Sequence, residues 1–347
     1  MAVLLFCAAF LAAVGFAQNL DSAFVGLNEQ GNLLLQSPKG KDIVVDGVLF
    51  RTLLRSLEKL EQDNAKLTKR VEMLEGRSGG VTADGGVFIG DLTLIGLVDQ
   101  WVLTELPALK HIGDFKIQNS NLTNVDGFGR LTSIGGHLDI SSNVNLTNVD
   151  GFGRLTSIGG QLSINYNKKL NNLDGFGSLT SIRNNVQIIG NPNLINVDGF
   201  GNLTSIVGDL NVNSNLNLTN VDGFGSLTSI GNLNIYNNNN LTSLHGLGNL
   251  TSIRSGLTIE LNNNLVNVDG FGSLTSIGGN LIITGNNNLI NVDGFGSLTS
   301  VGSIHIVGSK LKATNCFPAL KCMGGLGLSG GCTSAAESRL KALPPCV

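Results

Sequence analysis

The side chains that could carry out chemistry are scattered along this chain. Of its four histidines, His137, His245 and His305 lie in separate stretches of the sequence, without a matching acid and nucleophile. Hydroxyl groups are abundant, but a catalytic serine or threonine needs a positioned base within hydrogen-bond reach. The glycine-rich turns lack the sequence context of a phosphate-binding loop. The sequence therefore predicts a protein that is not an enzyme, with no catalytic residue, no metal site and no cofactor.

Cysteine chemistry is concentrated at the C-terminal end. Apart from Cys7, the cysteines all fall within the last 32 residues, at Cys316, Cys322, Cys332 and Cys346. An even number of clustered cysteines in a secreted chain predicts two disulfides, with three pairings open. Zinc is the alternative, but no C-x₂-C pair and no nearby histidine supports it. We expect residues 313–347 to form a disulfide-containing cap.

Two further residue types recur at regular intervals. An Asp-Gly pair repeats about every 24 residues and supplies Asp126, Asp150, Asp174, Asp198, Asp222, Asp269 and Asp293. Threonine recurs with the same spacing at Thr132, Thr156, Thr180, Thr204, Thr228, Thr251, Thr275 and Thr299. We interpret both as turn chemistry, in which carboxylates find local N–H groups and hydroxyls bond the turn backbone. Weak divalent-cation binding by the aspartates and ice binding by the threonines are the alternatives.

These spacings belong to a repeat that predicts the fold. Each unit reads roughly L-x-I-x-x-N-x-x-L-x-N-V-D-G-F-G-x-L-T-S-I-G-G-x, and its apolar residues recur at steps of two and three, without a sustained helical period. One coil cannot bury its own apolar set, so several must stack with Leu on Leu and Phe on Phe. We expect an all-β, right-handed parallel β-solenoid of leucine-rich type over residues 91–312. It has nine strand positions, from Phe115–Ile117 to Ile304–Ile306, after a degenerate cap at Leu92 to Leu106.

An asparagine recurs three residues after the strand Ile or Val in seven of the nine predicted coils. The positions are Asn143, Asn167, Asn191, Asn215, Asn238, Asn262 and Asn286. A buried amide offers two donors and an acceptor. In a stack, each amide can bond the turn backbone of its own coil and of the next, satisfying groups that a sheet ladder does not reach. We expect a structural asparagine ladder.

The pattern L-x-I-x-x-N-x-x-L with L-T-S-I-G-G resembles the receptor L domain, the leucine-rich solenoid of insulin- and EGF-receptor ectodomains. It is also similar to fungal GPI-anchored cell-wall proteins that carry repeats of this kind. The resemblance covers about Leu92 to Lys312 and implies a role as a receptor, a wall component or an adhesin. The chain departs from both families. We expect no GPI anchor, because no hydrophobic tail ends the sequence, and no signalling receptor, because no transmembrane helix or kinase accompanies the repeats.

The N-terminal part predicts secretion and self-association. Residues 1–17 form an apolar run that ends in small residues, which indicates a cleaved signal peptide; a retained anchor is the alternative. Residues 18–47 suggest a short β-hairpin, residues 48–76 a coiled-coil stalk and residues 77–90 a Gly-rich linker.

The stalk keeps a heptad repeat from Phe50 onward. Its a and d positions include Leu53, Leu57, Leu60, Asn64, Leu67, Val71 and Leu74. Leu at every d position after Phe50 and one Asn at an a position predict a parallel coiled coil, a homodimer or trimer, with the buried Asn64 favouring two strands. A single amphipathic helix folded onto the solenoid is the alternative.

Turn residues are nearly copied from repeat to repeat, whereas the outward strand positions vary. A polar face that carries two tyrosines suits a carbohydrate or an extended protein partner. The candidate ligand-binding residues are Asn165, Tyr166, Gln187, Asn213, Tyr236 and Glu260. Drift at tolerant solvent positions after duplication is the alternative.

Six N-x-T sequons are candidate N-glycosylation sites. They begin at Asn121, Asn145, Asn202, Asn217, Asn240 and Asn249. Four of them share one position in the repeat, so attached glycans would line one corner and leave the opposite face free.

Together these features predict an extracellular function. The net charge is −3, so no basic surface suggests nucleic-acid binding. We expect a secreted structural or adhesion protein of the cell surface or cell wall, without a membrane span in its mature form. It would bind glycan or protein ligands through the solenoid face and be multimerised by the coiled coil. An ice-binding or soluble receptor-like solenoid is the alternative.

Overall fold

The computed structural model divides the chain into two compact units, Met1–Met73 and Leu74–Val347. The residues it describes are 24–27, 33–36, 42–45, 80–81, 87–88 and 90–346, except 97, 99, 101–102, 104–108, 309, 313–315 and 330–331. The predicted signal peptide, the stalk with its heptad residues Leu53 to Leu74 and most of the predicted linker lie outside these residues. Within the described part, no helix combines the length and apolar character needed to cross a bilayer.

The first unit contains a small antiparallel sheet. Its strands are β1 (Phe24–Leu27), β2 (Leu33–Gln36) and β3 (Asp42–Val45), in the order β1-β2-β3. β2 and β3 pair antiparallel on either side of residues 37–41.

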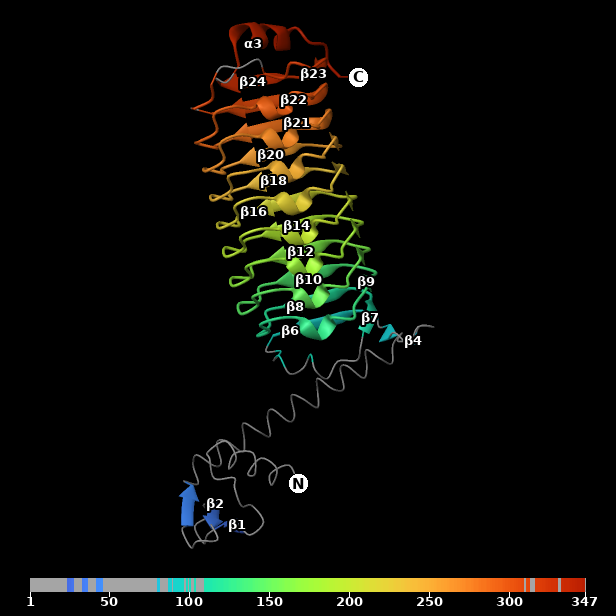
Figure 1. Ribbon diagram of the computed structural model, residues 1–347, viewed down its shortest axis with the longest axis vertical. Helices are drawn as coiled ribbons and strands as arrows, with labels where there is room; N and C mark the ends of the chain where they lie inside the picture. Colours follow the sequence, from blue (N-terminus) through green and yellow to red (C-terminus); the bar gives the residue numbers. More distant parts are fainter. Residues whose placement is uncertain are drawn as a thin grey trace. The chain divides into compact units, whose positions relative to one another are not determined.

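The second unit is a stack of parallel strands, one rung for each repeat (Figure 1). Leu and Ile alternate with outward residues in each strand, so one face of every rung is apolar. The rungs are β6 (Leu92–Ile95), β8 (Phe115–Gln118), β10 (Leu138–Ser141), β12 (Leu162–Asn165), β14 (Val186–Ile189), β16 (Leu210–Asn213), β18 (Leu233–Tyr236), β20 (Leu257–Glu260), β21 (Ser276–Thr284), β22 (Ser300–Val307) and β24 (Leu326–Ser329). β6 pairs with β8 as a full rung, so the segment expected to be a degenerate cap begins with a regular strand.

Two other elements complete each coil. The Ser-Ile pair of the repeat forms a second line of parallel strands: β9 (Ser133–Ile134), β11 (Ser157–Ile158), β13 (Ser181–Ile182), β15 (Ser205–Ile206), β17 (Ser229–Ile230) and β19 (Ser252–Ile253). The first residues of β21 and β22 continue this line, and β7 (Leu109–Ile112) and β23 (Cys322–Met323) take the same position near its two ends. β4 (Gly80–Val81) and β5 (Val87–Phe88) extend this line beyond β7. The Asp-Gly-Phe segment forms a stacked 3-10 turn: η2 (Asp126–Phe128), η3 (Asp150–Phe152), η4 (Asp174–Phe176), η5 (Asp198–Phe200), η6 (Asp222–Phe224), η7 (His245–Leu247), η8 (Asp269–Phe271) and η9 (Asp293–Phe295). The structure is therefore a solenoid-like repeat of mostly parallel β coils.

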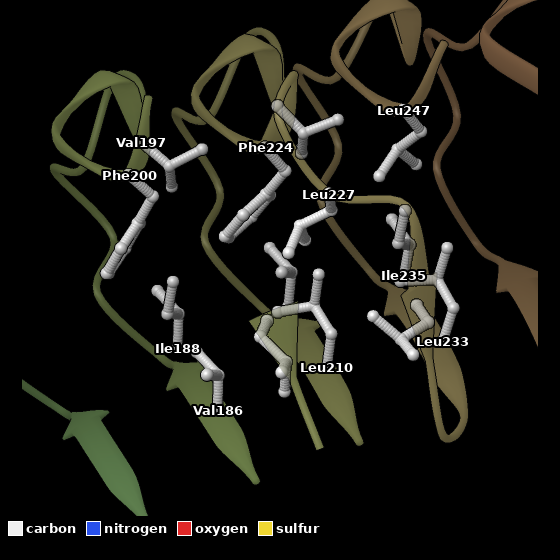
Figure 2. Packing of buried hydrophobic residues seen from close by; sticks show 14 of the residues in the cluster. Val186, Ile188, Val197, Phe200, Leu210, Phe224, Leu227, Leu233, Ile235 and Leu247 are labelled. Carbon is white, nitrogen blue, oxygen red and sulfur yellow. The ribbon is translucent and has the colours of Figure 1, made fainter. Parts of the chain in front are cut away.

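The core is a set of columns, each made of one repeat position. Figure 2 shows Val186 and Ile188 on one rung, Leu233 and Ile235 on another, and the aromatic column above them. Phenylalanine rings from Phe128 to Phe224 stack with centroid distances of 5.4–6.1 Å. Leu247 takes the aromatic position in the degenerate coil and is also buried. Parallel in-register stacking therefore places each apolar residue on its own equivalent.

The C-terminal segment contains both a further coil and a cap. Phe317 stacks on Phe295 with 5.7 Å between ring centroids, and β23 and β24 pair in parallel with β22. The two predicted disulfides are confirmed, and their pairing is Cys316–Cys332 and Cys322–Cys346. Both cross-links therefore join the last coil to the residues that follow it.

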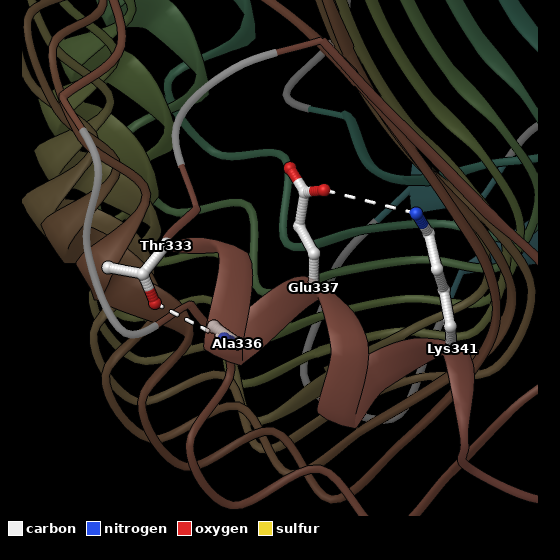
Figure 3. A network of polar contacts seen from close by, with 4 residues as sticks. All are labelled: Thr333, Ala336, Glu337 and Lys341. Carbon is white, nitrogen blue, oxygen red and sulfur yellow. Dashed lines mark hydrogen bonds and ion pairs between the residues drawn. The ribbon is translucent and has the colours of Figure 1, made fainter.

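Helix α3 (Ser334–Lys341) lies at the end of the stack (Figure 1). It is N-capped by Thr333, whose Oγ1 accepts a hydrogen bond of 3.2 Å from the Ala336 backbone N–H, and Glu337 pairs with Lys341 (Figure 3). Arg339 donates from its guanidinium to the backbone carbonyls of Phe317 and Cys316 at 2.7 and 3.0 Å. The helix is thus held against the last coil by hydrogen bonds as well as by disulfides.

Candidate functional site: the outer face of the long strands

Four of the predicted ligand-binding residues are brought together in one column. The long strands are the rungs from β8 to β21. We name their last residues the strand-end column: Gln118, Ser141, Asn165, Ile189, Asn213, Tyr236, Glu260 and Thr284. Asn213, Tyr236 and Glu260 are direct neighbours, and Asn165 is one rung further, beyond Ile189. Gln187 lies in the middle of its strand, opposite Ser163 and Asn211. The structure therefore assembles the candidate residues on one sheet face.

Tyr166 belongs to a second column with an unusual backbone. The residue that follows each strand end has a positive φ, between 50° and 67°, at Asn119, Ser142, Tyr166, Gly190, Ser214, Asn237, Leu261 and Gly285. Small or amide side chains are the usual occupants of this conformation, whereas a bulky residue is an outlier. Tyr166 and Leu261 are the bulky members, with φ of 58° and 57°. The sequence shows the mixed composition of this column but not its backbone conformation.

Each bulky member of this column lies across a glycine of the next coil. A Cβ added to Gly190 would be 2.7 Å from Cδ1 of Tyr166, and one added to Gly285 would be 2.6 Å from Cδ2 of Leu261. The Tyr166 side chain is nevertheless 59% exposed. The Tyr166 ring therefore packs against Gly190 of the next coil and still remains accessible to solvent.

Two buried acceptors flank the centre of the strand-end column. Within the described part of the chain, the side-chain Oδ1 atoms of Asn165 and Asn213 are buried and have no hydrogen-bond partner. These residues lie on either side of Ile189. An acceptor left unpaired in this way costs free energy in the folded state. Further along, Glu260 is tied to its neighbour, because Thr284 Oγ1 donates to its Oε1 at 2.7 Å.

The asparagine ladder is structural and runs in one direction. All seven asparagines are buried. Asn191 is typical: its Nδ2 donates to the Ile164 carbonyl at 2.8 Å, and its Oδ1 accepts from the Asn167 backbone N–H at 3.0 Å. Both partners belong to the preceding coil. Ser120 occupies the first position, where it donates to Asn143 through its backbone N–H and its hydroxyl.

A third polar ladder precedes the strands and was missed by the sequence interpretation. The last residue of a coil uses its side chain to accept the backbone N–H at the same position of the next coil. The donor–acceptor pairs are Asp114–Asp91, His137–Asp114, Gln161–His137, Asp209–Asn185, Asn232–Asp209 and Gly256–Asn232, at 2.7–2.9 Å. The sequence signal is a column of acceptor side chains before each strand, whose variation between Asp, His and Asn conceals it.

The threonine hydroxyls bond turn backbone. Thr156 Oγ1 donates to the Thr132 carbonyl at 3.0 Å, and the same bond recurs in most later coils. Each of these hydroxyl donors is therefore engaged by the protein itself, as expected of turn chemistry.

Asparagine side chains supply most of the turn chemistry expected of the aspartates, although Asp222 Oδ1 does accept the Gly246 backbone N–H of the next coil at 3.1 Å. Asn172 Oδ1 accepts the Asp174 backbone N–H at 3.2 Å, as its equivalents do in six other coils. Burial and the adjacent Asp174 and Asp126 carboxylates raise the pKa of Asp150. Among the described residues, no three His, Cys, Asp or Glu side chains gather closely enough to hold a metal ion.

The sequon asparagines occupy two repeat positions. Asn121, Asn217 and Asn240 are exposed and Asn145 is half-buried, all at the corner that follows the asparagine ladder. Asn202 and Asn249 lie after the 3-10 turn, and each Nδ2 donates to a carbonyl of the preceding coil at 2.7 Å. The amide nitrogens at this second position are therefore already engaged in the folded chain.

Comparisons with known proteins leave the repeat as the basis for assigning a function. No family model matches the chain, and no curated protein matches it either.

Proposed function

We propose that this chain is a secreted, non-enzymatic structural or adhesion protein that binds an extracellular glycan or protein through the outer face of its long strands. The observation that carries the proposal is the contrast within each rung. Inward residues are copied from coil to coil, while the strand-end column and Tyr166 combine exposed tyrosines with amide groups. Tyrosine offers a large contact area at a low entropic cost, and its ring can lie against a sugar face.

Further features support an extracellular location. Two disulfides are consistent with an oxidising compartment. The sequons, the apolar residues 1–17 and the resemblance to right-handed, leucine-rich solenoids of the receptor L-domain type agree with it. Within this proposal the heptads of residues 48–76 join copies as a parallel dimer. The weak binding sites of the two joined copies would then act together, and the dimer would bind a repetitive surface about 10²–10⁴ times more tightly than a single copy does.

A glycan array probed with the full secreted chain tests the binding face. Tyr166→Ser and Tyr236→Asn introduce residues that the repeat already uses at these positions, as in Ser142 and Asn213. We expect the double variant to lose about tenfold or more in affinity with an unchanged melting temperature, because exposed aromatic anchors dominate such surfaces. Ile195→Asn, at an exposed position on another side of the coil where the preceding coil has Asn171, is the matched control and should retain binding.

Three outcomes would contradict parts of the proposal. Equal binding by the tyrosine variant and the control would exclude the strand face. Thermal hysteresis produced by the purified chain would favour the ice-binding alternative. For the stalk, light scattering that gives a strictly monomeric mass at micromolar concentration would exclude the dimer.

A further inference from the structure

A basic pocket lies on a different side of the coils, near the first rungs. Its volume is about 480 Å³, and its lining includes Lys110, His111, Arg130, Thr132 and Arg154. Lys110 and His111 come from β7, and the two arginines follow η2 and η3. Three basic side chains, one lysine and two arginines, thus share one pocket in a chain whose net charge is −3.

The framework under the pocket is fixed by hydrogen bonds. Thr132 donates to the Lys110 carbonyl through both its backbone N–H, at 2.9 Å, and its Oγ1, at 3.0 Å. His111 Nδ1 lies 2.6 Å from Ser133 Oγ. The backbone of β7 is therefore held against the next coil.

The two arginines depart from the rule of the repeat. In four later coils the equivalent residue donates to a carbonyl of the preceding coil at 2.6–2.7 Å; these residues are Ser178, Asn202, Ser226 and Asn249. Arg130 and Arg154 are exposed, and within the described residues their guanidinium groups make no hydrogen bond or ion pair. Asp126 and Asp150, four residues earlier in the same coils, form no ion pair with them in that part of the chain. The first two coils thus replace a structural hydrogen bond by an unpaired cation.

We propose that this pocket binds the carboxylate or sulfate groups of an acidic polysaccharide. A guanidinium group presents a planar fork of donors that matches both anions. Arg130 and Arg154 follow one another on adjacent coils, which stack about 4.8 Å apart, so their charges form a short row along the stack. A linear polymer with regularly spaced anions fits such a row.

The lining favours a polysaccharide over the other anionic partners. The residues are cationic, hydroxylic, imidazole or glycine, with no apolar side chain among them. Protein interfaces combine arginine with aromatic anchors such as Trp and Tyr, and basic membrane-binding helices carry apolar residues that insert beside their cations. The pocket lining offers neither kind of side chain. The site is independent of the strand-end column, which lies on the outer face of the long strands.

Surface plasmon resonance of the full chain tests the site. The immobilised polymers are a sulfated glycosaminoglycan, polygalacturonate, poly-glutamate and neutral dextran. Arg130→Ser combined with Arg154→Ser introduces the residue used at this position in later coils, and should weaken binding to one or both acidic polysaccharides by about tenfold at low salt. Lys168→Asn combined with Lys169→Asn removes the same charge elsewhere and should change affinity by less than about twofold.

A gain-of-function variant separates the site from general charge effects. Ser178→Arg extends the row to a third coil and should tighten binding by a few-fold. The proposal is overturned if neither acidic polysaccharide binds, or if the arginine and lysine variants lose affinity equally. It is also overturned if poly-glutamate binds more tightly than both polysaccharides with the same dependence on the arginines, which would assign the pocket to an acidic peptide.

Discussion

The inward and outward residues of a single strand follow opposite rules. In β14, Val186 and Ile188 are fully buried, and their counterparts in every rung are Leu, Ile, Val or Phe. Gln187 and Ile189 alternate with them and face outward, and their columns contain charged, amide, hydroxyl, aromatic and aliphatic residues. The difference follows from parallel stacking. An inward residue packs on its own equivalent above and below, so one change disturbs two interfaces, whereas an outward residue meets solvent.

The largest expected effect comes from the glycine within the 3-10 turn. A Cβ added to Gly175 would lie 1.8 Å from the Val149 carbonyl oxygen of the preceding coil. Because that atom belongs to the backbone, Gly175→Ala should lower the free energy of unfolding by about 3 kcal/mol, measured by denaturant titration. Gly177→Ala is the matched control, since its nearest contact, the Asp174 carbonyl oxygen, is 3.3 Å away. Equal destabilisation by both would show that the close stacking of turns is not the cause.

The next effect concerns buried polar groups. Asn191→Ala removes the donor to the Ile164 carbonyl and the acceptor of the Asn167 N–H, and both groups stay buried. We expect a loss of about 2–3 kcal/mol in unfolding free energy. Asn193→Ala, an exposed asparagine two residues later, should change it by less than about 0.5 kcal/mol. Equal melting temperatures for the two variants would show that the buried asparagine contributes no more to stability than the exposed one.

The smallest effect concerns the outer aspartate column. Burial, with the neighbouring Asp174 and Asp222 carboxylates, raises the pKa of Asp198 above its usual 3.8. The folded state therefore holds this proton more tightly than the unfolded state. As the pH rises from about 3.8 through the raised pKa of the folded state, ionisation of Asp198 lowers the free energy of unfolding. Below pH 3.8 the group is protonated in both states, and this cost is absent.

Asp198→Asn should accordingly raise the melting temperature slightly at pH 7. Because the group is largely exposed, solvent screening limits the gain to about 0.5 kcal/mol or less, and no gain should remain at pH 3. Asp293→Asn, at the end of the column with a single aspartate neighbour, should give a smaller gain. A loss of stability at pH 7 would instead indicate that the carboxylate makes a stabilising turn contact.

The degenerate coil shows which parts of the repeat are constrained. His245 and Leu247 replace Asp and Phe, yet η7 forms as in the other coils. Gly246 is retained, and a Cβ there would lie 2.1 Å from the Val221 carbonyl oxygen. The aspartate is thus dispensable for the turn, the aromatic ring can be replaced by another apolar group, and the glycine is set by contact between coils.

The parallel coils, their 24-residue period, the apolar columns and the asparagine ladder follow from the sequence alone, because a repeat that stacks in register brings equivalent residues together. The disulfides also follow, from an even number of clustered cysteines. Only the tertiary structure decided which cysteines pair, that Phe317 and β24 continue the stack into the expected cap, and that the Tyr166 side chain lies across Gly190 with a positive φ. It also decided that Lys110 joins two arginines in one pocket. These features depend on distances between neighbouring coils and on backbone angles at single positions, which a repeat pattern does not encode.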